Sequence, residues 1–260
     1  KEVMFEIRRV VLGVTKGIAD PQPRVLIWLK QGVDHCMDPV LAGAFIEQSL
    51  KNADIDYMTT YKETAFVREL RTDLYNVFVM VNLTKTRETN LEVEGRVLAG
   101  DGVIAFKNFP EELPKLRDMF GNHFLGRRCS SNEHVVQIAS SQLSSEGSFR
   151  VLGKMGITNM ESWGSSVVGT FADGPTPDNA AVTLNQYGLG RTILMGFDPS
   201  AIDGATDLAY VEDIFIGGVN YVTPESYYLD PLSIAGIAIN IENLNIPLDL
   251  RVREMTDPEL

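Results

Sequence analysis

Polar and charged side chains follow several apolar runs in this sequence, and their types suit acid–base chemistry or the binding of a polar ligand. A histidine, a carboxylate and a lysine together hold the base, acid and charge-stabilising groups that hydrolysis needs. Loops after buried strands are also polar simply because they are solvated, so a noncatalytic edge is the competing interpretation. The candidate residues are Asp34, His35, Asn82, Lys85, Lys107, Asn108, Asp198 and Ser200.

Buried strands are expected to bring these residues to one edge of a sheet. Apolar runs at residues 24–30, 77–81 and 103–106 are typical of strands covered on both faces, and segments with helical spacing separate them. This alternation predicts parallel pairing through right-handed crossovers, and therefore an α/β fold with an open, largely parallel sheet and helices on both faces. Open α/β sheets bind ligands in the crevice at the carboxyl ends of their strands.

The expected elements change in character after about residue 130. Before it, we predict helices from Asp38, over residues 62–70 and 88–99, and after a proline beyond Asn108, with a short strand at residues 56–60. After it, the sequence predicts a β-rich half closed by a helix. Its expected strands span residues 135–143, 149–154, 166–172, 180–186 and 191–197, and the helix spans residues 208–222.

Composition excludes several classes of partner. The 260 residues carry a formal net charge of −12, which disfavours a phosphate-binding surface. No apolar run approaches the roughly 20 residues of a membrane span. Two cysteines, Cys36 and Cys129, and three histidines show no zinc-ligand spacing. The sequence therefore predicts no nucleic-acid partner, no membrane insertion, no metal and no cofactor.

Five segments together resemble the class I glutamine amidotransferase-like superfamily. They are RVLIW, YNVFVMVNLT, GDGVIAF, LPKLRDMFGNHF and YGLGRTILMGFDPS, and the likeness lies in their order and spacing. The resemblance implies a flavodoxin-like sheet and, in active members, a Cys-His-Glu triad. At the matching positions this chain has Lys107 or Asn108, Asp198 and Ser200, so the resemblance implies a member that has lost its triad.

The two ends of the chain have a different pattern. Residues 1–22 and 225–260 contain alternating apolar residues typical of half-buried antiparallel strands, whereas residues 23–224 hold the α/β domain. The stretch IAINIENLNIPLDLRVRE resembles the opening of immunoglobulin-like repeats in bacterial surface proteins. That likeness implies neighbouring domains in a larger extracellular, cell-surface or periplasmic protein. The alternative is that both ends extend the main sheet.

The function expected from these observations is a noncatalytic domain with a structural, ligand-binding or protein-interaction role. Its expected partners are neighbouring domains of the same longer protein and a small polar ligand or protein. A homodimer through the terminal strands is also expected, because unpaired strand edges tend to pair. The alternative is a hydrolase or amidotransferase relative that uses His35, Lys107 and Asp198.

We expect residues 24–224 to fold without the flanks, because the buried sheet does not depend on them. A fragment trimmed to these limits should keep a cooperative thermal transition and a monomeric mass. An insoluble fragment, or one without a cooperative transition, would show that the ends are integral to the main domain.

Overall fold

The computed structural model describes residues 22–29, 39–72, 74–81, 87–106, 114–128, 133–152, 157–172, 179–202 and 204–224. Strands and helices alternate at first, in β1 (Arg24–Leu29), α2 (Pro39–Asn52), β2 (Asp56–Thr60), α3 (Glu63–Leu70), β3 (Val77–Val81), α4 (Arg87–Leu98) and β4 (Gly102–Phe106). Strands then predominate, in α5 (Pro114–Phe120), β5 (Asn122–Arg128), β6 (His134–Ile138), β7 (Gly147–Val151), β8 (Ile157–Ser162), β9 (Ser166–Phe171), β10 (Ala180–Tyr187) and β11 (Gly190–Met195), followed by the 3-10 turn η2 (Pro199–Ala201) and α6 (Ala205–Val222).

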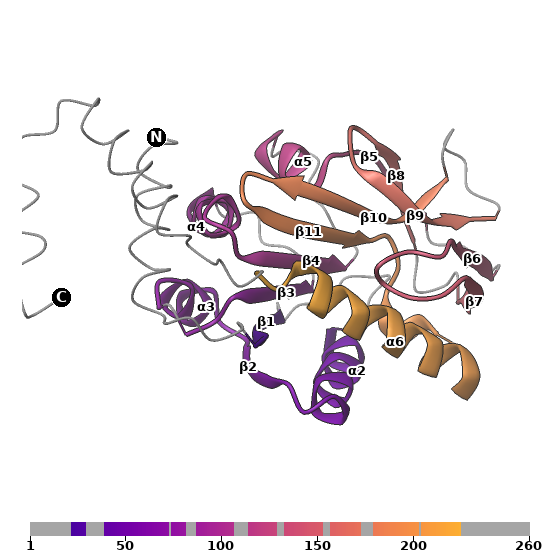
Figure 1. The fold of residues 1–260 in the computed structure, drawn as a ribbon, viewed down its shortest axis with the longest axis horizontal. Coiled ribbons are helices and arrows are strands. Elements are labelled where there is room, and N and C mark those ends of the chain that lie inside the picture. Colours follow the sequence, from indigo (N-terminus) through magenta and orange to yellow (C-terminus); the bar gives the residue numbers. More distant parts are fainter. Residues whose placement is uncertain are drawn as a thin grey trace, which may run out of the picture. The chain divides into compact units, whose positions relative to one another are not determined.

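The strands form one mixed sheet in the order β2-β1-β3-β4-β11-β10-β9-β6-β7, with β8 joined to β10 and β5 joined to β8 (Figure 1). The α/β class is confirmed, but the expectation of a largely parallel sheet is wrong. Of the ten pairings in the described part of the chain, four are parallel and six are antiparallel. Where consecutive strands pair, short connections are the physical reason, because a tight turn such as Gly188-Leu189 between β10 and β11 can join only antiparallel strands.

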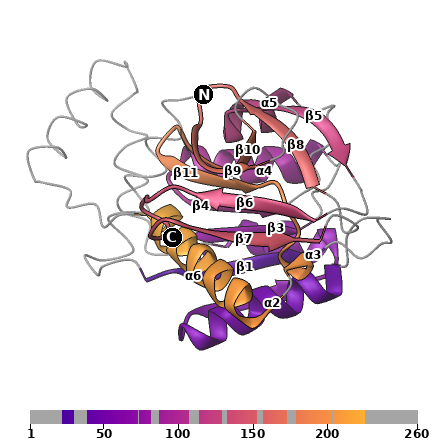
Figure 2. The same ribbon diagram turned by 90° about the vertical axis from the view of Figure 1, so that its right-hand side faces the viewer.

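Helices cover both faces of the sheet. On one face, α2 and α6 pack through residues such as Ile46 and Phe215. On the other face, α3, α4 and α5 pack through residues such as Phe66, Val93 and Phe120. Figures 1 and 2 show α2 and α6 on the side of the sheet opposite to α4.

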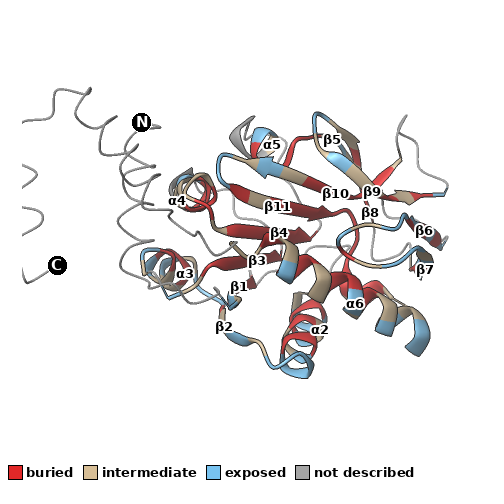
Figure 3. Ribbon diagram, in the orientation of Figure 1, coloured by how far each residue is buried: buried red, intermediate tan, exposed pale blue. Residues whose placement is uncertain are grey.

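The central strands are buried because each of them supplies apolar side chains to both layers. In β1, Val25 and Ile27 face the α2–α6 layer, whereas Leu26 and Trp28 face the α3–α5 layer. All of β3 and β4 is buried in the same way, and Figure 3 shows these strands covered while the outer faces of the helices are exposed. Continuous apolar runs therefore do mark central strands in this sequence.

The antiparallel half of the sheet is curled, so that β7, the strand at its outer end, contacts the segment that follows β11. A bridge between Val151 of β7 and Ile202 joins that strand to the segment after η2. Phe149 fills the space inside the curl, with its ring 5.1 Å from that of Phe197 and 6.3 Å from that of Tyr210. The β-rich half is therefore part of the same core as α6 rather than a separate layer.

Arg96 of α4 holds together the loops at the amino ends of the parallel strands. Its Nε atom forms an ion pair with Asp101 at 2.6 Å, and its Nη atoms donate to the carbonyl oxygens of Thr72 and Tyr75 at 3.2 and 2.8 Å. The guanidinium also lies over the ring of Phe78. One buried cation thus fixes the loops before β3 and β4 at the same time.

The flanks of the predicted domain lie outside the described residues, apart from Gln22. The expectations for residues 1–21 and 225–260, including pairing of the terminal strands and an immunoglobulin-like start, stay predictions. Among the described helices, none combines the length and the apolar character needed to cross a bilayer.

Replacing Arg96 with alanine should lower the free energy of unfolding by about 3 kcal/mol, because Asp101 and two backbone carbonyls lose a buried cation. Chemical denaturation measures this change. Arg68→Ala is the matched control, since the Arg68 side chain is 72% exposed and that of Arg96 is 7% exposed. The control should change stability by no more than about 0.5 kcal/mol. Equal effects of the two substitutions would contradict this role of Arg96.

Candidate functional site

Four parallel strands end on one line across the sheet. Leu29 of β1 pairs with Val81 of β3, Val81 pairs with Phe106 of β4, and Phe106 pairs with Met195 of β11. All four side chains are buried in the α2–α6 layer. The chain therefore leaves the sheet from four adjacent points, which is the arrangement that places ligand sites in open α/β sheets.

Six of the eight candidate residues follow these strand ends but lie outside the described residues. The expected crevice around them stays a prediction. They are Asp34, His35, Asn82, Lys85, Lys107 and Asn108. Cys36 and Cys129 also lie outside the described residues.

The structure brings the remaining two candidates, Asp198 and Ser200, into direct contact. Asp198 caps η2, and its Oδ1 atom accepts the backbone N–H of Ser200 at 2.8 Å and the Ser200 hydroxyl at 2.6 Å. The Asp198 side chain has no exposed surface, whereas Ser200 is partly exposed. Pro199 at the first position of the turn has the backbone angle that such a turn requires.

Backbone hydrogen bonds fix this turn on both sides. Before it, the N–H of Thr158 donates to the carbonyl of Gly196 at 2.7 Å. After it, the N–H of Leu152 donates to the carbonyl of Ala201 at 2.8 Å. The ends of β7 and β8 thus hold the segment in which Asp198 lies.

This geometry suits a structural role for Asp198 better than an acid–base role. One carboxylate oxygen already accepts two hydrogen bonds from within the turn. A carboxylate is a weak base at neutral pH, and a general base must also reach the proton that it removes from a substrate. A side chain with no exposed surface does not meet that second requirement.

A buried polar cluster that sequence reasoning missed joins α5 to β10. Asn122 donates through Nδ2 to the carbonyl of Phe120 at 2.7 Å and to Oγ1 of Thr183 at 2.8 Å. Its Oδ1 atom accepts the hydroxyl of Ser165 at 3.1 Å. Gly121, with φ of +62°, makes the turn before it. The side chains satisfy one another, so the cluster positions the turn; the Gly-Asn pair was the available signal.

Tyr187 forms a second polar contact, between β10 and α4. Its hydroxyl donates to Oε1 of Glu94 at 2.8 Å. Burial raises the pKa of Tyr187 well above the ordinary value, and the hydrogen bond and charge of Glu94 raise it further. The phenol therefore stays protonated beyond the pH at which an ordinary tyrosine ionises. Its stabilising contribution is present below the ordinary tyrosine pKa and is lost only as the pH rises above it.

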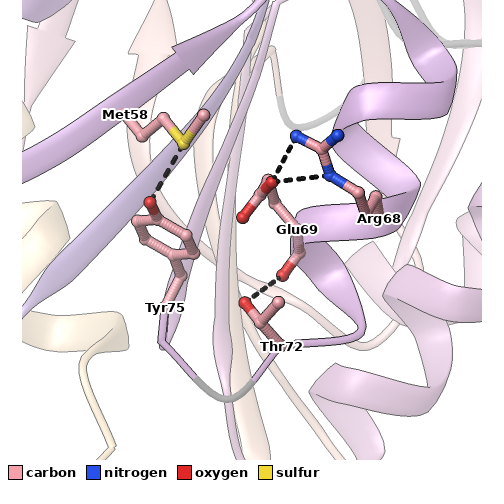
Figure 4. Close-up of polar contacts among 5 residues, drawn as sticks. All are labelled: Met58, Arg68, Glu69, Thr72 and Tyr75. Atoms are coloured by element: carbon pink, nitrogen blue, oxygen red, sulfur yellow. Dashed lines mark hydrogen bonds and ion pairs between the residues drawn. The ribbon is translucent and has the colours of Figure 1, made fainter.

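Figure 4 shows a third group of contacts, near the amino edge. The Tyr75 hydroxyl donates to the sulfur of Met58 at 3.0 Å, and the Thr72 hydroxyl donates to the carbonyl of Glu69 at 2.7 Å. Burial, followed by the charge of Glu69, raises the pKa of Tyr75. Arg68 pairs with Glu69 at 2.8 Å. These contacts order the end of α3 and offer no pairing of a nucleophile with a base.

The described residues contain no group of three or more His, Cys, Asp or Glu side chains that could hold a metal ion.

No family model matches this sequence, and none of the curated proteins is similar to it. Solved structures do match. The fold is similar to that of a ThuA-like protein from Bacteroides uniformis, with a TM-score of 0.59 and 13% identity over 78% of this chain and 92% of that chain. It is also similar to a cytoplasmic protein, STM3548, from Salmonella typhimurium, with a TM-score of 0.56 and 13% identity over 78% of this chain and 100% of that chain.

The same fold occurs inside longer chains. A β-galactosidase from Rahnella sp. R3 matches with a TM-score of 0.61 and 16% identity over 80% of this chain, but only 32% of the β-galactosidase is covered. The chain thus spans about a third of the length of that enzyme. At such identities these likenesses show the fold alone. The neighbours that share this fold thus include a ThuA-like protein, which itself has the class I glutamine amidotransferase-like fold.

Asp198→Ala should lower the free energy of unfolding by about 1–2 kcal/mol, because the turn loses its cap and Ser200 loses its acceptor. Ser200→Ala removes one of these two bonds and should cost about 0.5–1 kcal/mol. Chemical denaturation of both variants, with exposed Asp213→Ala as the control, measures the difference. An Asp198→Ala protein as stable as the control would contradict the structural role.

Proposed function

We propose that this chain is a noncatalytic member of the amidotransferase-like fold that serves as a ligand-binding or protein-interaction domain within a larger protein. The proposed binding region is the carboxyl edge, where Asp34, His35, Asn82, Lys85, Lys107 and Asn108 follow the line of strand ends. Side chains of these types are suited to bind a polar ligand or a neighbouring domain.

One observation carries the noncatalytic part of this proposal. Asp198 and Ser200 occupy the positions at which active amidotransferases are expected to hold two members of the triad, and here they bond to each other in a buried turn. A base that serves catalysis must accept a proton from a nucleophile or a substrate at an accessible site. Using the same carboxylate as the cap of a turn is incompatible with that task.

Two observations support a place inside a longer chain. The flanking residues 1–22 and 225–260 have the alternating pattern of strands from another domain. In addition, the matching fold makes up only 32% of the β-galactosidase chain, so this fold does occur as a segment of larger proteins. An extracellular, cell-surface or periplasmic location is proposed on the pattern of the flanks alone.

The hydrolase alternative has His35, Lys107 and Asp198 as the acting residues, with Asp198 either as a base that reaches the substrate or as a buried carboxylate that orients the histidine. The burial of Asp198 and its two hydrogen bonds within the turn argue against the first of these roles. The noncatalytic proposal and this alternative differ in what they expect of the same variants.

The purified 260-residue protein should release no glutamate or ammonia from glutamine, because no triad position has a suitable residue. A coupled glutamate assay with an active glutaminase as the positive control measures this. Turnover that disappears in His35→Ala, Lys107→Ala or Cys36→Ser would contradict the proposal and favour a rebuilt active site.

Substitutions at the proposed binding edge should weaken the binding of a partner without unfolding the domain. His35→Ala and Lys107→Ala should each change the thermal midpoint by no more than about 2 °C, as expected for loop positions. When the domain is compared with the longer protein that contains it, hydrogen exchange at residues 30–38 and 82–86 should slow down. Identical exchange in both forms would overturn the assignment of this edge as the binding region.

A further inference from the structure

Among the described residues, three strands pair on one side only, namely β2, β5 and β7. They differ in how their open edges are protected against pairing with another strand. The edge of β7 is closed by the bridge from Val151 to Ile202 and by Asp207, whose carboxylate accepts the N–H of Arg150 at 2.9 Å. The edge of β5 is irregular, because its register with β8 shifts between Phe124 and Gly126. Capping and bulges are the usual means by which proteins prevent strand edges from pairing.

The open edge of β2 is neither capped by another described segment nor interrupted by a bulge. Its pairing with β1 is regular from Asp56 to Thr60, with no bulge and no proline. Extended backbone continues at Lys62, which has φ of −115° and ψ of 130°. Tyr57 is 37% exposed and Tyr61 is 51% exposed. Tyrosine and threonine are favourable strand residues, so the segment from Asp56 to Lys62 is suited to pairing with another strand.

The sequence of this segment, DYMTTYK, is complementary to itself in the antiparallel direction. A two-fold axis through Thr59 places Tyr57 opposite Tyr61 and Met58 opposite Thr60. It also places Asp56 of each copy opposite Lys62 of the other. Directly opposed residues of antiparallel strands lie on the same face with Cβ atoms about 5 Å apart. Both ends of the pairing therefore bring a carboxylate to an ammonium group, and two aromatic pairs form between them.

The neighbouring register is less suitable. An axis through Met58 would place Lys62 opposite Asp54, but Asp54 has φ of +55° and lies in the turn before β2. The pairing centred on Thr59 instead uses only residues at or after the start of β2. Its aromatic pairs lie on the side of the sheet where the Thr59 hydroxyl donates to Glu47 of α2. Its charged pairs lie on the α3 side, because side chains alternate along a strand.

We propose that β2 is a self-association surface at which two copies of this chain join their sheets, with antiparallel β2 strands related by a two-fold axis at Thr59. The occupant is a second copy because the segment matches its own reverse in charge and in aromatic content. The symmetry is closed, so association stops at a dimer. Pairing through one short strand gives a weak dimer, with a dissociation constant on the order of 10–100 μM.

Charge-reversed variants of the 260-residue protein test this register. In Asp56→Lys and in Lys62→Glu, like charges meet at both ends of the pairing, so each variant should dimerise at least about tenfold more weakly than the unaltered chain. The double variant, Asp56→Lys with Lys62→Glu, should recover the original dimerisation. Both residues are exposed, and a glutamate at the start of α3 suits the helix dipole, so the fold should persist. Glu146→Lys, an exposed reversal in the loop between β6 and β7, is the matched control.

Mixing the two single variants gives a second, independent result. In their heterodimer the introduced lysine faces the introduced glutamate at one end, and the unaltered Asp56 faces the unaltered Lys62 at the other. The mixture should therefore dimerise as the unaltered chain does, although each variant alone dimerises at least about tenfold more weakly. Sedimentation equilibrium up to about 0.5 mM measures the unaltered chain, the variants, the mixture and the control. A chain that stays monomeric at this concentration would overturn the proposal. A dimer that persists in both single variants would also overturn it and would indicate another surface, such as the terminal strands.

Discussion

The fold depends on β11, because among the described strands it is the one that pairs in parallel on one side and antiparallel on the other. On one side it runs parallel to β4, with Thr192 to Met195 in register with Val103 to Phe106. On the other side it is antiparallel to β10 through a two-residue turn. A parallel half built from crossovers and an antiparallel half therefore share one strand. Its side chains must fit both layers, which explains why Ile193, Leu194 and Met195 are fully buried.

The position of β11 also determines what can follow it. The chain leaves β11 at the line of strand ends, and in a catalytic relative this would be the place for exposed acid–base groups. Here the segment after β11 closes the curled half, through its bridges to β7 and β8. A segment that completes a core must be rigid and desolvated, whereas a catalytic base must reach substrate. Asp198 fulfils the first requirement, because its carboxylate holds the turn from inside the core.

The sequence predicted strands correctly where burial on both faces determines the local pattern of residues. Continuous apolar runs identified β1, β3 and β4 to within one residue at either end, because strands covered on both faces have little freedom in composition. It failed for β5 and β8, whose NHFLGRR and ITNMES segments have no apolar alternation and owe their conformation to pairing with each other. Parallel pairing was overestimated for the second half, since the direction of a strand depends on the length of its connections.

The difference between what local pattern predicts and what tertiary pairing decides also applies to the candidate site. The structure shows that the Asp-Pro-Ser segment follows a capping pattern, in which Asp198 accepts hydrogen bonds from Ser200, whereas the sequence prediction placed both residues in the ligand crevice. What the local pattern does not contain is the burial of the carboxylate, which follows from the bridges of Phe197 and Ile202 to strands far away in the sequence. Only the tertiary pairing decides whether a side chain can reach a substrate.

The mixed sheet finally limits where a ligand could be bound. Antiparallel strands send their connections alternately to the two edges, so they do not gather loops at one place. Only β1, β3, β4 and β11 end on a common line in the described part of the sheet, and one of these four exits is occupied by the capped turn at Asp198. The three remaining exits lead into the segments that carry Asp34, Asn82 and Lys107. Because η2 contacts α2 and Asp198 has no exposed surface, the exit from β11 is filled by packed side chains. A turn packed in this way stabilises the end of β11, at the place where the chain leaves the sheet.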